Sequence, residues 1–268
     1  MSILDIIALA LIQGITEFLP ISSSGHLVLW PLLTGRPDQG ITMDVAAHLG
    51  TLLAVCLYFR AETGQLARGG VDIVARRWDS DDARLAILVA VATIPAVAAG
   101  VALKLSGAMD SLRSIAVIGW TTLIGGILLW LADRYGRENR AGDGWRMRDA
   151  VLMGLAQACA LVPGTSRSGA CMTMARALGF KRDEGATLAL VMAIPVILAA
   201  SLVELAGLIK DGNLVLGLEL VAGAVLSFLS ALAALAVMMR MFQTEWTMLP
   251  FVIYRLVLGV FLLVLAYS

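Results

Sequence analysis

Charged residues are scarce in this sequence of 268 residues. Asp, Glu, Lys and Arg make up only 15% of it, whereas 59% of the residues are hydrophobic. The mean hydropathy is +0.87. A soluble domain has a larger charged share and cannot bury that much apolar surface. The composition therefore excludes an ordinary soluble protein and predicts an integral membrane protein.

The sequence also has few cysteines and no net charge. The three cysteines, Cys56, Cys159 and Cys171, are scattered through apolar runs. Their odd number and spacing fit neither a disulfide framework nor a zinc site. The formal net charge is zero, so no general field attracts nucleic acid and no nucleic-acid partner is expected. Residues 1–5 lack the basic n-region of a signal peptide, and we expect the mature protein to keep them.

What the sequence has in abundance is long apolar stretches. Six of them are long enough to cross a bilayer as helices. They cover residues 43–59, 85–103, 114–132, 185–206, 220–239 and 246–267. The bilayer is therefore an expected partner. The 60–84 and 133–149 segments carry charges of both signs, and we expect them to be solvated connectors.

Two further apolar segments, about 2–33 and 150–179, are each interrupted by a polar loop. The first loop runs from Leu19 to His26 and the second from Val162 to Gly169. Irregular backbone at membrane depth persists only where protein or a wet cavity surrounds it. We therefore expect an all-α fold of six transmembrane helices plus two re-entrant helix–turn–helix hairpins.

The two hairpins share a residue pattern. Gln13, Ser22, Ser24 and Gly25 recur 144 residues later as Gln157, Ser166, Ser168 and Gly169. Each half of the chain then reads as one hairpin followed by three spans, so the second half must be inverted relative to the first. We predict a single membrane domain over 1–268, with repeat one at about 1–132 and repeat two at about 150–268.

The charges of the loops predict an orientation. Fourteen of the 20 Lys and Arg residues fall in one set of loops, and four in the opposite set, namely Arg36, Lys104, Arg113 and Lys210. By the positive-inside rule the first set is cytoplasmic. We therefore expect a multi-pass protein of the bacterial plasma membrane with both termini outside. The sequence also allows a homodimer.

The first polar loop concentrates groups that are costly inside a membrane. Glu17 lies four residues after Gln13 on the same helical face, and Ser22, Ser23, Ser24 and His26 follow it. A Glu near a helix end can simply be interfacial, with the serines capping the next helix. The crowding of a carboxylate, hydroxyls and an imidazole favours a functional site instead.

The second loop adds a cation. Arg167 stands between Ser166 and Ser168, and Gly169 follows them. The planar guanidinium suits a phosphate, although a salt bridge to Glu17 is the structural alternative. Both loops precede helices whose N-termini offer free backbone N–H groups to an anion. Together the two loops predict a phosphate site.

These residues carry a family resemblance. The run from Gln13 to His26 and the run from Pro163 to Gly169 resemble the two signature motifs of the undecaprenyl-diphosphate phosphatases linked to bacitracin resistance. The resemblance implies removal of the terminal phosphate from undecaprenyl diphosphate, a polyprenyl diphosphate lipid, which recycles the carrier for cell-wall synthesis. It also implies a divalent cation, Mg²⁺ or Ca²⁺, and sensitivity to bacitracin.

The resemblance also implies roles for individual residues. We assign catalysis to Glu17, Ser23, His26 and Arg167, and the cation to Glu17. Substrate binding is assigned to Gln13, Ser22, Ser24, Ser166, Ser168 and Gly169. Gln13 stands where many members have Glu, which removes one possible ligand charge, so we do not expect a metal site with two carboxylates. We interpret His48 as packed or interfacial, and Arg255 as paired or snorkelling.

Two chemical schemes and two rival functions stay open at this point. Either Ser23 attacks phosphorus while His26 takes its proton, or His26 itself attacks or protonates the departing lipid phosphate. Inverted repeats are also typical of transporters, so a lipid-carrier flippase is the alternative function. The other lipid phosphatase superfamily needs a second His after its Ser-Arg, and no His follows His48.

Overall fold

The fold is helical throughout the part of the chain that the structure describes. The structure, a computed structural model, describes residues 3–35, 40–107, 110–210, 217–244 and 246–268. Helices occupy these ranges, which contain no β-strand, so the all-α prediction is confirmed. The expectation for residues 1–2 and the placing of Arg36 in an outer loop lie outside the described residues.

Six of the helices in the described ranges are long and apolar enough to cross a membrane. They are α3 (Ile41–Tyr58), α5 (Asp81–Ser106), α6 (Ile115–Tyr135), α9 (Arg182–Lys210), α10 (Leu218–Gln243) and α11 (Leu249–Tyr267). All six predicted spans are found, and most helices run past the apolar stretch. For example, Ser80 caps α5 by accepting a hydrogen bond from the N–H of Ala83 at 3.0 Å, which starts the helix before its apolar part.

Two helix–turn–helix segments occupy the predicted hairpin positions. The first pairs α1 (Ile3–Phe18) with α2 (Ser23–Thr34), and the second pairs α7 (Met147–Cys159) with α8 (Arg167–Ala177). α1 has 16 residues, which at about 1.5 Å per residue is shorter than the hydrocarbon core of a bilayer. Pro20 and the Pro163–Gly164 pair interrupt the two helical paths, as expected for residues that cannot continue a helix.

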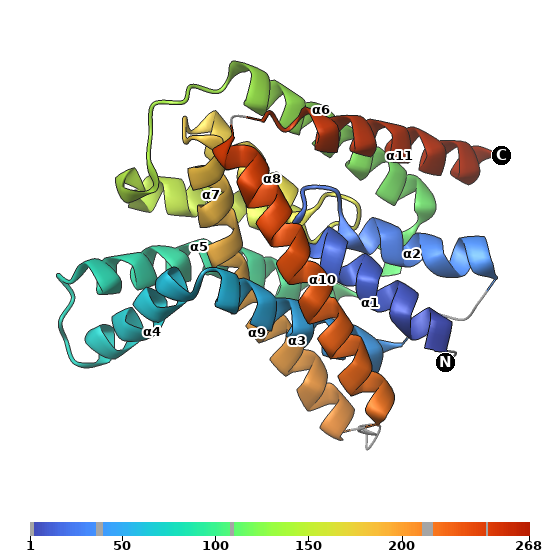
Figure 1. The fold of residues 1–268 in the computed structure, drawn as a ribbon, viewed down its shortest axis with the longest axis horizontal. Coiled ribbons are helices and arrows are strands. Elements are labelled where there is room, and N and C mark those ends of the chain that lie inside the picture. The colour runs from blue at the N-terminus through green and yellow to red at the C-terminus, as the bar shows by residue number, and fades with distance from the viewer. Residues whose placement is uncertain (1–2, 36–39, 108–109, 211–216, 245) are drawn as a thin grey trace.

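Close helix packing places the two turns at the centre of the molecule (Figure 1). α1 packs along α10, α7 packs along α5, and α6 lies beside α11. Glycines allow these approaches: a Cβ added at Gly14 would stand 1.9 Å from Ser230 Oγ of α10. One added at Gly154 of α7 would stand 2.6 Å from the carbonyl of Ala92 in α5. Small residues at helix contacts are the usual means of close packing in membranes.

The 60–84 segment is more ordered than expected. It was predicted as a solvated connector, and most of its residues are indeed exposed or half-buried, but residues Arg60–Val74 form α4, which packs on α5. The three glycines of this helix lower its helix propensity, and its mixed charges give no apolar pattern, so the sequence did not predict it. Tertiary contacts stabilise it instead: Arg68 Nε donates to Asp82 at 2.6 Å, and Ser80 Oγ donates to Asp72 at 2.6 Å.

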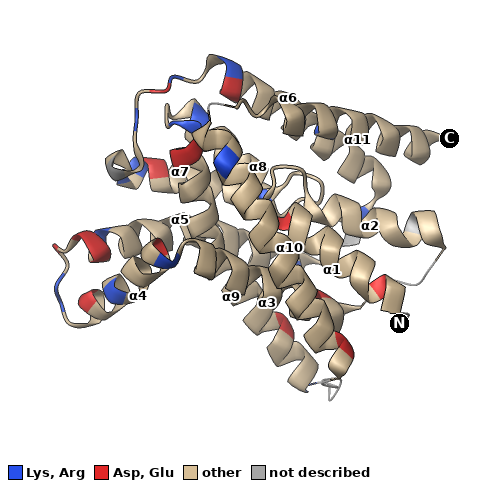
Figure 2. Cartoon of the chain, in the orientation of Figure 1, with Lys and Arg blue, Asp and Glu red and all other residues tan. Residues whose placement is uncertain are grey.

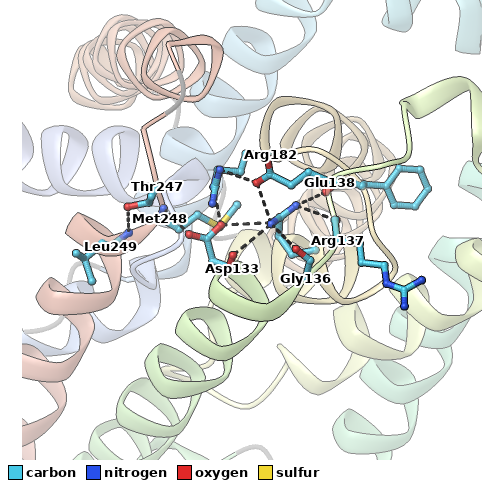
Figure 3. A network of polar contacts seen from close by, with 10 residues as sticks. Asp133, Gly136, Arg137, Glu138, Arg182, Thr247, Met248 and Leu249 are labelled. Carbon is cyan, nitrogen blue, oxygen red and sulfur yellow. Dashed lines mark hydrogen bonds and ion pairs between the residues drawn. The ribbon is translucent and has the colours of Figure 1, made fainter.

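The 133–149 segment was also interpreted as a solvated connector. This is wrong for two of its charged residues, Asp133 (Figure 3) and Asp149, which are buried. Arg176 of α8 is fully buried and donates to Asp133 at the end of α6. Arg182 donates to the same carboxylate at 2.7 Å and pairs with Glu138 at 2.6 Å. Asp133 Oδ2 accepts from the backbone N–H of Met248 at 3.0 Å. The network ties together α6, α8, α9 and the start of α11.

Replacing Arg176 with methionine should destabilise the protein strongly. The change keeps much of the side-chain volume but leaves the buried Asp133 carboxylate short of one partner, which costs about 3–5 kcal/mol for a buried pair. We expect a clear drop in the thermal unfolding midpoint of the protein in detergent. Arg134→Met, at an exposed position beside the network, is the control and should change stability by less than about 0.5 kcal/mol. Equal midpoints for the two variants would contradict a structural role for the network.

Candidate active site

The two turns touch each other. Loop 1 (residues 19–22) joins α1 to α2, and loop 2 (residues 160–166) joins α7 to α8. Ser168 Oγ donates to the carbonyl of Leu19 at 2.9 Å, and the N–H of Gly164 donates to Ser24 Oγ at 3.2 Å. Ser168 of α8 therefore holds loop 1, and Ser24 of α2 holds loop 2. Residues about 140 positions apart in sequence meet at one point.

Matching serines shape the two turns in the same way. Ser22 has φ 76° and Ser166 has φ 68°, values that non-glycine residues rarely adopt. Ser22 Oγ accepts from the N–H of Gly25 at 3.4 Å, and Ser166 Oγ accepts from the N–H of Gly169 at 3.1 Å. Such backbone conformations cost about 1–3 kcal/mol each and cluster at functional sites. The shared strain marks both turns as candidate parts of a site.

Glu17 is the residue on which the site converges. Its Oε1 pairs with the guanidinium of Arg167, so the salt bridge considered from the sequence is present. Its Oε2 accepts from Gln13 Nε2 and from Ser23 Oγ, both at 2.8 Å. The Glu17 side chain is only 6% exposed. The two loops thus bring together a carboxylate, a hydroxyl and a guanidinium, which are three of the four predicted catalytic groups.

A cavity of about 210 Å³ opens at this cluster. Six predicted site residues line it, namely Glu17, Ser22, Ser23, Ser24, Ser166 and Arg167. Alanine, leucine, valine and isoleucine side chains from α5, α9 and loop 2 complete the wall. The other predicted binding residues support it from behind: Gln13 holds Glu17, while Ser168 and Gly169 hold the loops. A polar end beside apolar walls suits a ligand with a charged head and an apolar body.

His26, the fourth predicted catalytic residue, is oriented differently from the expectation. Its Nδ1 contacts the carbonyl of Ser22 at 2.6 Å, and its Nε2 bonds to the hydroxyl of Tyr254. The two rings stack, with centroids 5.5 Å apart. Ser23, which the sequence paired with His26, donates to Glu17 instead. The spacing of three residues predicted that the two side chains would face each other, but the His26 ring turns toward α11.

Comparison with known proteins identifies the family. The family model "Bacitracin resistance protein BacA" matches residues 6–261. The chain belongs to this family. An undecaprenyl-diphosphatase of Roseobacter denitrificans is 48% identical over the full length of both chains, and one of Jannaschia sp. is 49% identical over the same extent. An undecaprenyl-diphosphatase of Alcanivorax borkumensis is 45% identical over 96% of each chain. The resemblance seen in the two motifs is confirmed.

Two residues of this BacA-family chain that the sequence analysis did not assign also line the cavity. His48 of α3 was interpreted as packed or interfacial, but its Nε2 lies 4.0 Å from Glu17 Oε2. Gln157 of α7 also lines the cavity and is the counterpart of Gln13 in the second half of the chain. The sequence repeat could therefore have identified Gln157 as a site residue. No local pattern singled out His48, because only the packing of α3 brings it to Glu17.

Arg255 has a role that the sequence analysis did not anticipate. It is fully buried in α11, so snorkelling is wrong, and no salt bridge is found for it among the described residues. Its guanidinium donates to the carbonyl of Pro20 in loop 1 at 3.2 Å, and to the carbonyls of Gly164 and Thr165 in loop 2 at 3.2 and 2.9 Å. One side chain therefore fixes both loop backbones relative to each other.

Proposed function

We propose that this protein removes the terminal phosphate from undecaprenyl diphosphate and leaves the monophosphate carrier lipid. The observation that carries the proposal is the convergence of Ser23 and Arg167 on Glu17 beside the cavity. Full-length relatives named undecaprenyl-diphosphatase support the same substrate. Those names give no support to the transporter alternative.

The geometry favours Ser23 as the nucleophile. Its Oγ already donates a hydrogen bond to Glu17 Oε2, so the carboxylate can accept the hydroxyl proton as the oxygen attacks. The Ser23 Oγ–phosphorus bond forms while the bond from phosphorus to the bridging oxygen breaks. The electron pair leaves with undecaprenyl monophosphate. Water then hydrolyses the serine phosphate to release inorganic phosphate and restore the hydroxyl.

Arg167 and the two helix N-termini can stabilise the transferred phosphoryl group. Arg167 pairs with Glu17 before substrate arrives and can turn its donors to the phosphate, which frees Glu17 for proton transfer. α2 begins at Ser23 and α8 at Arg167, so both helices begin beside the cavity. Helix N-termini attract anions through their free N–H groups. His26 remains the alternative nucleophile or the acid for the departing lipid phosphate.

A divalent cation is part of the proposal. No group of three His, Cys, Asp or Glu side chains in the described ranges could hold a metal ion alone. Mg²⁺ commonly binds one or two carboxylates together with phosphates of the substrate, and Glu17 offers one carboxylate at the cavity. The residues therefore fit a cation that is shared with the diphosphate. Such a cation would neutralise negative charge on the phosphates.

The membrane arrangement follows from the same features. We propose that the two helix–turn–helix segments are re-entrant hairpins and that the chain is an inverted repeat within one membrane domain. The packing supports this, because a two-fold relation would exchange the α1–α10 contact with the α7–α5 contact. The loop serines also repeat their geometry. A homodimer stays a prediction.

The site is proposed to open toward the outer face of the bacterial plasma membrane. Figure 2 shows Lys and Arg gathered near α4 and the start of α7, whereas both termini lie at the other side (Figure 1). In a background free of the native cysteines, a cysteine at Lys210 should react with an impermeant thiol reagent on intact cells. A cysteine at Arg76 should react only after permeabilisation. The reverse pattern would place the site on the cytoplasmic face.

Phosphate release by the purified protein in detergent tests the function. We expect the C55 diphosphate to be cleaved best, a short-chain prenyl diphosphate less well, and a soluble monophosphate least. The apolar walls of the cavity are the physical reason, because they bind lipid and not a small sugar or alcohol. Movement of the lipid across liposomes without phosphate release would overturn the proposal.

A further inference from the structure

His48 presents a lone pair to the cavity. Its Nδ1 lies 2.8 Å from the carbonyl of Asp44, and a carbonyl can only accept, so Nδ1 carries a hydrogen. In the neutral imidazole Nε2 is then an acceptor. This Nε2 lies 4.0 Å from Glu17 Oε2, which is too far for a hydrogen bond. Two acceptor atoms therefore face each other at the edge of the cavity.

Gln157 adds a third acceptor. The residue is 2% exposed, and its Nε2 donates to the carbonyl of Ala92 at 3.3 Å. Its Oε1 has no hydrogen-bond partner among the described residues, although the residue lines the cavity. Leaving a buried amide oxygen without a partner is energetically unfavourable, because it loses its hydrogen bonds to water. An unpartnered amide oxygen on a residue that lines the cavity thus calls for a ligand that can accept its lone pair.

The substrate cannot satisfy His48 Nε2 and Gln157 Oε1 by itself. A diphosphate brings only acceptor oxygens, which would meet the Glu17 carboxylate and the His48 lone pair in a small cavity that Gln157 also lines. Opposed acceptors repel unless a cation stands between them. On the basis of the proposed phosphatase function, we propose that His48 Nε2 and Gln157 Oε1 join Glu17 as the protein's ligands for the divalent cation.

The ligand types predict which cation binds best. Mg²⁺ and Ca²⁺ prefer oxygen ligands, whereas an imidazole nitrogen favours transition metals. A set of one carboxylate, one imidazole and one amide oxygen should therefore bind Mn²⁺ more tightly than Mg²⁺ or Ca²⁺.

The test measures binding of Mn²⁺ alone to the full-length protein in detergent by electron paramagnetic resonance. His48→Leu and Gln157→Leu should each weaken Mn²⁺ binding by at least about tenfold. Gln157→Glu adds a charged ligand at the same place and should tighten binding, a gain that only a folded protein can show. Gln243→Leu makes the same chemical change at an exposed position at the end of α10 and should leave binding unaltered.

The outcomes separate this inference from the proposed function. Unchanged Mn²⁺ affinity in both leucine variants and in Gln157→Glu would overturn the ligand assignment, even if the wild type hydrolyses the lipid. A wild-type protein that binds Mn²⁺ with these ligands but releases no phosphate would instead overturn the phosphatase function. Wild type that binds no Mn²⁺ and works fully in excess EDTA would overturn the cation site.

Discussion

Arg167→Ala is expected to lower the kcat for phosphate release by at least about 100-fold, which is typical for loss of a group that stabilises a phosphoryl transition state. Arg167 lines the cavity, and within the described ranges its ion pair is with Glu17 alone, so its donors can transfer to the diphosphate. The loss should appear in kcat more than in KM, because the charge on the phosphoryl group grows in the transition state. Steady-state kinetics with the C55 diphosphate provide the measurement.

Two further variants make this prediction specific. Arg167→Lys keeps the charge but loses the planar fork of donors, so it should restore only part of the rate. Ser166→Ala changes the neighbouring residue, whose hydroxyl is engaged by Gly169 and Ser168, and should cost less than about tenfold. A Ser166→Ala enzyme as impaired as Arg167→Ala would mean that loop 2 acts through its shape and not through the guanidinium.

Hydropathy and turn residues were sufficient to predict the six long apolar helices and the breaks within the two helix pairs. The six apolar stretches correspond to six helices, because a span such as α3 (Ile41–Tyr58) needs only length and few charges. Pro20, Pro163 and Gly164 likewise located the breaks between the paired helices, since proline cannot continue a helix. The ion pair between Glu17 and Arg167 was one of the two alternatives considered, because a lone buried charge needs a partner.

The sequence did not predict the direction of individual side chains or the contacts between distant residues. His26 follows Ser23 by three residues, but Tyr254, 228 residues away, turns its ring toward α11. His48 lies within an apolar span, and only the packing of α3 beside α1 brings it to Glu17. Arg255 looked like a residue for pairing or snorkelling, whereas the backbone carbonyls of both loops surround it. No local pattern encodes which carbonyls a distant guanidinium will meet.

Ser23→Ala is expected to have the largest effect of all, a loss in kcat of at least about 10³-fold, as for other enzymes that lose their nucleophile. His26→Ala should lose about 100-fold, the contribution of an acid–base group. The difference arises because Ser23 Oγ already donates to Glu17, whereas His26 is held by Ser22 and Tyr254. Single-turnover measurements of phosphate release would give both rates.

The chemistry of the trapped intermediate decides between the two nucleophiles. With substrate labelled at its terminal phosphate, an acid quench in the first turnover should leave label on the protein if Ser23 attacks, since a serine phosphate ester survives acid. A phosphohistidine at His26 would lose its label in acid and keep it in alkali. Tyr254→Phe removes only the hydroxyl that contacts His26 Nε2 and serves as the matched control, with the label expected to remain on Ser23. If the label is instead acid-labile in the wild type and does not form in His26→Ala, the nucleophile is His26.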